Sequence, residues 1–83
     1  MKVRYFAWLR ERLNRGEEEI DPPAEVVTVG DLIQWLRDRD EAADLAMQKP
    51  NLIKAALDAE IVPHSAPLGN VKVVALFPPM TGG

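Results

Sequence analysis

The stretch Thr28-Val29-Gly30-Asp31-Leu32-Ile33-Gln34-Trp35-Leu36 carries the clearest helix signal in this chain of 83 residues. The Thr28 hydroxyl is placed to accept a hydrogen bond from an early helical N–H, and the Asp31 carboxylate is placed to accept one in return, which forms a capping box. That carboxylate also suits the positive end of the helix dipole. Behind this start, apolar residues recur at one-turn spacing, at Val29, Leu32, Ile33 and Leu36. The stretch therefore predicts a helix with a single apolar stripe.

The residues that follow are less clearly patterned. Residues 40–48 predict a second short helix, anchored by Leu45 and Met47 and ended by Pro50. Residues 52–62 are ambiguous, because the centre of the segment favours a helix by propensity while both of its ends favour a strand. Propensity alone favours the helix there.

The beginning and the end of the chain alternate with the period of a strand. Residues 2–8 predict a strand that points Val3, Tyr5 and Ala7 inward and leaves Phe6 and Trp8 on the outside. Exposed apolar groups of this size are typical of a contact site, although a strand covered on both faces gives the same pattern. Residues 10–16 then read as a polar connection and residues 17–20 as a return strand, while residues 71–77 form a strongly β-branched run that predicts the last strand.

Composition narrows the class of protein. With 47% apolar and 28% charged residues the chain is an ordinary globular protein, and its length allows one domain with a thin core. The net charge of -3 gives no electrostatic footprint for nucleic acid, and no apolar run approaches the roughly 20 residues that span a bilayer. We therefore expect a cytoplasmic protein that binds neither nucleic acid nor membrane. Without cysteine the chain has no disulfide, thiolate nucleophile or Cys-based zinc site.

Conventional catalytic sets are absent from the sequence. Ser65 is the single serine and its sequence neighbour His64 the single histidine, so a triad is excluded and His64 is expected to be a loop residue. The acidic groups around residues 17–21 and 38–44 lack the spacing of a calcium loop, which favours a solvated face over a metal site. No glycine-rich phosphate loop is present.

The last residues, Leu76-Phe77-Pro78-Pro79-Met80-Thr81-Gly82-Gly83, are the remaining candidate for chemistry. Two prolines remove two N–H donors and favour an extended stem, and the five residues from Pro79 onward span roughly 17 Å when extended. Two glycines without Cβ atoms can enter a channel too narrow for side chains. The reactive group would then be the Gly83 carboxylate, which is ionised at neutral pH and needs activation, for which we expect adenylation with ATP.

These residues resemble the sulfur-carrier (small) subunits of molybdopterin synthase, which are ubiquitin-like β-grasp proteins. The resemblance covers nearly the whole chain and is most specific in the ending F-P-P-x-x-G-G. It implies an α+β fold, with a mixed sheet and one main helix packed on one face. It divides the chain into a β-grasp domain over residues 1–77 and a projecting, flexible tail over residues 78–83. It also favours two short strands around a turn near Asp58-Ala59 over the helix in residues 52–62.

The resemblance further implies a function and its partners. An E1-like enzyme would use ATP to adenylate Gly83, a sulfur donor protein would convert it to a thiocarboxylate, and the large synthase subunit, in a heterotetramer, would use that sulfur on a pterin precursor. Catalytic residues are expected on the large subunit, and this chain is expected to bind no permanent cofactor and no metal. The implied site comprises Gly83 as the sulfur-bearing residue, a tail of Gly82, Thr81, Met80, Pro79 and Pro78, and a hydrophobic partner interface of Phe6, Ile61 and Phe77.

Some points remain open at this stage. Simple alternation from Lys72 points Val73, Ala75 and Phe77 inward, whereas the resemblance places Phe77 at an interface; we follow the resemblance, since patterns are least dependable where a strand ends. Two departures from the family pattern are Asp58 in place of an asparagine and residues 69–72 in place of an acidic turn. Alternative functions are a carrier for thiamine or tungsten-pterin synthesis, a modifier joined to target lysines, and a non-covalent interaction module.

Overall fold

The fold is built from five strands and three α-helices, in a computed structural model that describes residues 1–79. In chain order the elements are β1 (Lys2–Tyr5), α1 (Ala7–Leu13), β2 (Glu17–Glu19), α2 (Val29–Arg39), α3 (Glu41–Ala46), the 3-10 turn η1 (Pro50–Leu52), β3 (Lys54–Leu57), β4 (Glu60–Val62) and β5 (Val73–Phe77). Strands and helices are mixed along the chain, and the elements that the sequence predicts with least ambiguity, α2 and β5, are both present.

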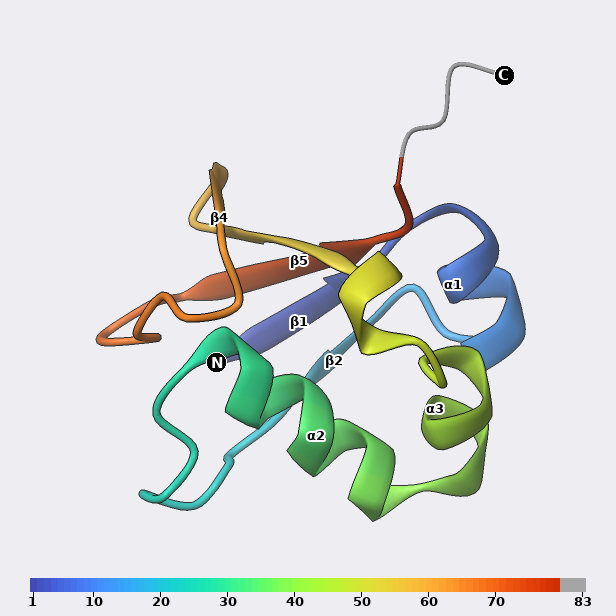
Figure 1. Cartoon of the computed structure of the whole chain (residues 1–83), viewed down its shortest axis with the longest axis horizontal. Helices are drawn as coiled ribbons and strands as arrows, with labels where there is room; N and C mark the ends of the chain where they lie inside the picture. Colours follow the sequence, from blue (N-terminus) through green and yellow to red (C-terminus); the bar gives the residue numbers. More distant parts are fainter. Residues whose placement is uncertain (80–83) are drawn as a thin grey trace.

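The strands form one mixed sheet in the order β2-β1-β5-β3-β4. The first and last strands of the chain, β1 and β5, are parallel neighbours at its centre, and every other pair is antiparallel. Figure 1 shows α2 running below β1 and β2, with α1 and α3 gathered at one end of the sheet. The expected mixed sheet with a main helix on one face is therefore confirmed.

The core lies between the sheet and α2. Alternate residues of the two central strands, Val3 and Tyr5 in β1 and Val74 and Leu76 in β5, are buried, as is the whole apolar stripe of α2. The capping box is also present, since the Asp31 N–H donates to the Thr28 hydroxyl and the Thr28 N–H donates to the Asp31 carboxylate, each at 3.1 Å. The helix prediction from residues 28–36 is confirmed in its start and in its buried face.

The predicted strand over residues 2–8 is wrong at its C-terminal end. The chain leaves β1 after Tyr5, with Ala7 at a φ of 55°, and enters α1. Trp8 is therefore helical, and Ala7 is exposed and does not point into the core. The residues read as a polar connection are mostly this helix, which buries Leu9 and Leu13, one turn apart. Asn14 ends α1 in the left-handed conformation that asparagine tolerates better than most residues. Because α1 has only two buried positions, its helical periodicity is too short to be recognised in the sequence. The alternation of Phe6 and Trp8 with smaller residues favoured a strand there instead.

The second short helix is confirmed, but one of its predicted anchors is wrong. In α3 the buried side chains are Ala43 and Ala46, followed by Met47, whereas Leu45 is 59% exposed. The spacing of Ala43, Ala46 and Met47 is that of one helix face, and the small alanines allow α3 to pack closely beside its neighbours. Leu45 consequently lies on the outer side of α3.

Residues 52–62 form two strands, as the resemblance implies, and not a helix. The hairpin of β3 and β4 turns at Asp58 and Ala59, which both have positive φ, at 46° and 75°. Two consecutive residues with positive φ are typical of a two-residue hairpin turn, in which the twist of the turn matches that of the flanking strands. The Asp58 carboxylate accepts hydrogen bonds from the N–H groups of Lys72 and Val73, at 3.1 and 2.9 Å, and so fixes the turn beside the start of β5.

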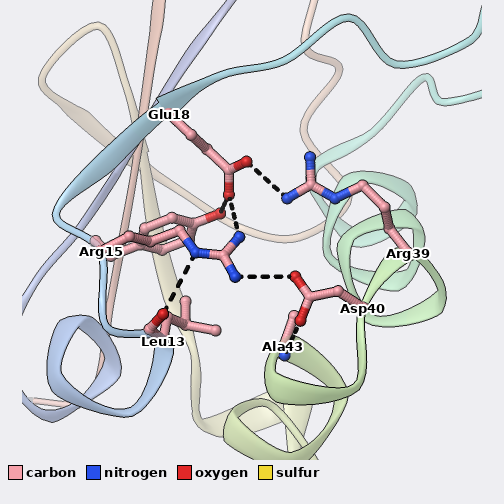
Figure 2. A network of polar contacts seen from close by, with 7 residues as sticks. Leu13, Arg15, Glu18, Arg39, Asp40 and Ala43 are labelled. Atoms are coloured by element: carbon pink, nitrogen blue, oxygen red, sulfur yellow. Dashed lines mark hydrogen bonds and ion pairs between the residues drawn. The ribbon is translucent and has the colours of Figure 1, made fainter.

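A polar network joins β1 and β2 to the junction of α2 and α3. Figure 2 shows the Glu18 carboxylate between the guanidinium groups of Arg15 and Arg39, at 3.0 and 2.7 Å. The same carboxylate accepts a hydrogen bond of 2.7 Å from the buried Tyr5 hydroxyl, and Arg15 reaches Asp40 at 3.2 Å. Glu18 thus satisfies the one polar atom that Tyr5 brings toward the core.

The network sets the ionisation of its members. Burial alone would raise the pKa of Glu18, but the hydrogen bonds from Tyr5, Arg39 and Arg15 outweigh it and hold that pKa below its usual value. Burial and the hydrogen bond to Glu18 raise the pKa of Tyr5, so its hydroxyl stays protonated and donates. The hydrogen bond from the Ala43 N–H, assisted by Arg15, lowers the pKa of Asp40.

We expect the substitution Glu18→Gln to lower the free energy of unfolding at neutral pH by about 1 to 2 kcal/mol, because an amide replaces a carboxylate that accepts three hydrogen bonds. Since the folded-state pKa of Glu18 is depressed, its contribution is present above the unfolded-state pKa and is lost as the pH falls through the folded-state pKa. Urea unfolding at neutral and acidic pH measures both effects. The exposed Glu25→Gln is the control, and a gap between wild type and Glu18→Gln that widens in acid would contradict this assignment.

Candidate docking face and C-terminal exit

The face of the sheet away from α2 presents apolar side chains on its central strand. In β5, Val74 and Leu76 are buried in the core, while Val73, Ala75 and Phe77 alternate with them on the opposite face and are half-buried. The alternation that pointed these three residues inward is therefore wrong by one position. Simple counting from Lys72 failed because the strand begins at Val73, after a bend. Phe77 lies on the side that the resemblance implies.

Phe6 is positioned by the bend that ends β1. Its N–H donates to the carbonyl oxygen of Leu76 at 3.1 Å, which extends the parallel pairing by one residue, and its side chain is 43% exposed. It lines a shallow depression of about 390 Å³ together with Arg4, Val73 and Ala75 on the outer face. The outward direction of Phe6 predicted from alternation is confirmed, although the strand ends one residue earlier.

Ile61 reaches the same face from the far edge of the sheet. In the strand register Ile61 lies opposite Ala56, and Ala56 lies opposite Ala75, so these residues share one side of the sheet. At 73% exposed, Ile61 is the most solvent-accessible large apolar side chain in residues 1–79. The structure therefore brings Phe6, Ile61 and Phe77 to one face, here called the docking face.

The C-terminal exit lies at the end of β5. Pro78 is buried and continues the inward alternation of Val74 and Leu76, and Pro79 is half-buried. The stem that the sequence suggests as projecting from residue 78 is thus held by the body of the fold at its first proline. The other predicted tail residues, Met80, Thr81, Gly82 and Gly83, lie outside the described residues.

The remaining sequence candidates have structural roles. A ring nitrogen of His64 lies 2.6 Å from the carbonyl oxygen of Ile53, to which its N–H donates, and His64 lies in a turn as expected. The acidic residues Glu17 and Asp44 pair with Lys2 and Arg37. Within the described part of the chain, no cluster of His, Asp or Glu is placed to hold a metal ion. None of the helices within residues 1–79 has the length and hydrophobicity of a membrane-spanning segment.

Sequence reasoning missed the Tyr5–Glu18 contact and the apolar groove formed by α1, α3 and η1, which is described below. Alternation gives a signal for the first, since Glu18 is the central residue of β2 and lies opposite the inward Val3. The groove had no such signal, because it depends on α1, which the sequence pattern did not reveal.

Comparison with known proteins agrees with this arrangement. A model of the ThiS family matches residues 3–83. The chain is 34% identical over 83 residues to the molybdopterin synthase sulfur carrier subunit of Escherichia coli (strain K12), covering 100% of this chain and 99% of that protein. A solved Pyrococcus furiosus protein, assigned as molybdopterin converting factor, subunit 1, is 30% identical over 95% of both chains, with a TM-score of 0.73.

A second solved structure, SAMP1 from Haloferax volcanii, superposes with a TM-score of 0.73 over 100% of this chain and 98% of its own. At 24% identity that likeness supports the fold alone. The mixed sheet and these neighbours confirm the ubiquitin-like β-grasp fold. Since the family model extends over nearly every residue and a curated relative matches along its full length, the chain belongs to the ThiS family.

Proposed function

We propose that the protein is a sulfur carrier whose working group is the carboxylate of Gly83. The observation that carries this proposal is membership of the ThiS family through to the terminal Gly82-Gly83 pair. An ionised carboxylate is a poor electrophile at neutral pH. An E1-like partner would therefore use ATP to form an acyl-adenylate with release of pyrophosphate, and a sulfur donor protein would supply the sulfur that displaces AMP. The product is a thiocarboxylate in which one sulfur replaces one oxygen.

We further propose that the carrier serves molybdopterin synthesis as the small subunit of a synthase heterotetramer. Support comes from the Escherichia coli and Pyrococcus furiosus relatives, at 34% and 30% identity along nearly their full lengths. The large subunit would provide the catalytic side chains, because the described part of this chain holds no cluster suited to that task. Carriage of sulfur for thiamine or for a tungsten pterin uses the same tail chemistry, and the partner that copurifies with the chain distinguishes these pathways.

In this proposal the body of the fold positions the tail. The docking face offers three apolar side chains, of which Ile61 is 73% and Phe6 43% exposed. Burying such side chains at an interface contributes most where aromatic groups are fully desolvated near its centre. Because Pro78 is buried and Phe6 is hydrogen-bonded to Leu76, the docking face and the start of the tail belong to one rigid unit. A partner that binds the face would therefore find the start of the tail, at Pro78, in a fixed place.

The chemistry predicts a defined covalent product. After incubation with a ThiS-family activating enzyme, ATP and a sulfur donor, mass spectrometry of the intact chain should detect the replacement of one oxygen by sulfur at Gly83. A variant with one bulky residue added after Gly83 should fold equally well and remain unmodified. Absence of the thiocarboxylate in the wild type, with adducts on target lysines instead, would contradict the carrier and favour a protein modifier.

The docking face predicts a separation of binding from stability. Ile61→Ala should weaken binding to the large subunit about fivefold or more, while changing the free energy of unfolding by less than about 0.5 kcal/mol, because the side chain is 73% exposed. Phe77→Ala should weaken binding at least as much. Calorimetric titration and urea unfolding measure the two quantities, with Val27→Ala, which is 54% exposed before α2, as the control. Equal losses of affinity for Ile61→Ala and Val27→Ala would remove the assignment.

A further inference from the structure

A second apolar surface lies away from the docking face, in a groove between α1, α3 and η1. Its volume is about 250 Å³, and its apolar lining comes from Trp8, Leu45 and Leu52. Leu45 is 59% and Leu52 41% exposed, so the groove is open to solvent. No side chain of the sheet lines it. The groove is thus separate from the docking face.

The rim of this groove is basic. Arg12 and Lys49 both line it, and within residues 1–79 neither side chain forms an ion pair, whereas Arg15, Arg37 and Arg39 all do. The Arg12 guanidinium lies 4.5 Å from the centre of the Trp8 ring, which holds its charge over the apolar floor. An occupant of matching chemistry has an apolar side chain for the floor and a negative charge for the rim.

The end of β5 lies beside the start of β3, the strand that follows η1 and this groove. Phe77 pairs with Lys54 in the antiparallel register of β5 and β3, and Lys54 follows the groove residue Leu52 by two positions in the sequence. On the other side of β5, the Phe6 N–H donates a hydrogen bond to the carbonyl oxygen of Leu76, and Phe6 precedes Trp8 by two residues. Figure 1 shows this end of β5 beside the start of α1.

The four residues after Pro79 have the required length and chemistry. Extended, they span roughly 13 to 14 Å, whereas Trp8 and Arg12 are separated by about one helical turn, or roughly 6 Å along α1. Met80 offers a flexible thioether that packs well against aromatic rings. Gly83 offers a carboxylate that is ionised at neutral pH. A second copy of the chain fits less well, because a symmetric contact would bring two basic rims together.

We propose that residues 80–83 bind back into this groove, with Met80 against Trp8 and Leu45 and the Gly83 carboxylate at Arg12 and Lys49. The contact is intramolecular and reversible, and it alternates with a released tail. While the tail is bound, its carboxylate is withheld from any enzyme that acts on it. The contact itself does not depend on the proposed sulfur chemistry, so failure of either leaves the other to be judged separately.

The absence of cysteine in the chain allows a direct test in the full-length protein. A nitroxide attached at Thr81→Cys should broaden the NMR signals of the Trp8 indole and of the Leu45 and Leu52 amides. The Trp35 indole on α2, which also lies under an arginine, is the matched internal control and should stay sharp. Neutralising the rim with Arg12→Gln and Lys49→Gln together should reduce the broadening about two- to fivefold for each exposed ion pair lost.

A second measurement needs no label. Met80→Ser in the otherwise unmodified chain should shift the Trp8 indole signal and leave that of Trp35 in place. Equal broadening at Trp8 and at the Ile61 amide, unaffected by the rim variants, would indicate a freely moving tail and overturn the proposal. Broadening that passes from labelled to unlabelled molecules in a mixed sample would assign the groove to a second copy and would overturn it as well.

Discussion

The parallel pairing of β1 with β5 is the contact on which the rest of the structure depends. It brings the first and last strands together at the centre of the sheet, with Val3 beside Val74 and Tyr5 beside Leu76, all four buried against α2. Parallel neighbours require a long crossover, which here comprises nearly the entire chain between them. The core is therefore closed only when the last strand is in place, and β5 cannot be loosened without exposing the centre of the molecule.

This closure explains how a small domain holds its C-terminal stem in a fixed place. Pro78 follows Leu76 on the buried side of β5, so the segment leading to the tail is part of the core. The opposite side of the same strand supplies Ala75 and Phe77 to the docking face. Because Ala75 and its neighbour Ala56 have small side chains, the centre of that face is recessed, and the larger side chains of Phe6 and Ile61 border it. One strand thus determines both the place where the tail begins and the shape of the surface beside it.

The sequence determines most of these elements, and its failures have identifiable causes. The capping box at Thr28 and Asp31 is a local signal, so α2 was predictable residue by residue. The β3–β4 hairpin was not predictable in this way, because the local propensity of these residues favours a helix. Strand pairing in the sheet overrides that propensity and holds Asp58 and Ala59 at positive φ, and only the resemblance indicated the hairpin. The helix α1 was hidden because Phe6 and Trp8 continue the alternation of β1 across a backbone bend. Contacts between distant segments, such as Tyr5 with Glu18, also depend on the strand register, which alternation within one strand does not determine.

Net charge is a poor guide to the field at the end of this chain. The net charge is -3, but the ion pairs are unevenly distributed over the molecule. The carboxylates of Glu18, Asp40 and Asp44 pair with arginines beside α2 and α3. Around the exit of β5, by contrast, four basic residues form no ion pair within residues 1–79, namely Arg10, Arg12, Lys49 and Lys54. The described part of the chain therefore presents positive charge around the end of its last strand. In the proposed function, a terminal carboxylate, and still more an acyl-adenylate with its phosphate, would be stabilised in such a field, so that the local arrangement of charge matters more than the net charge.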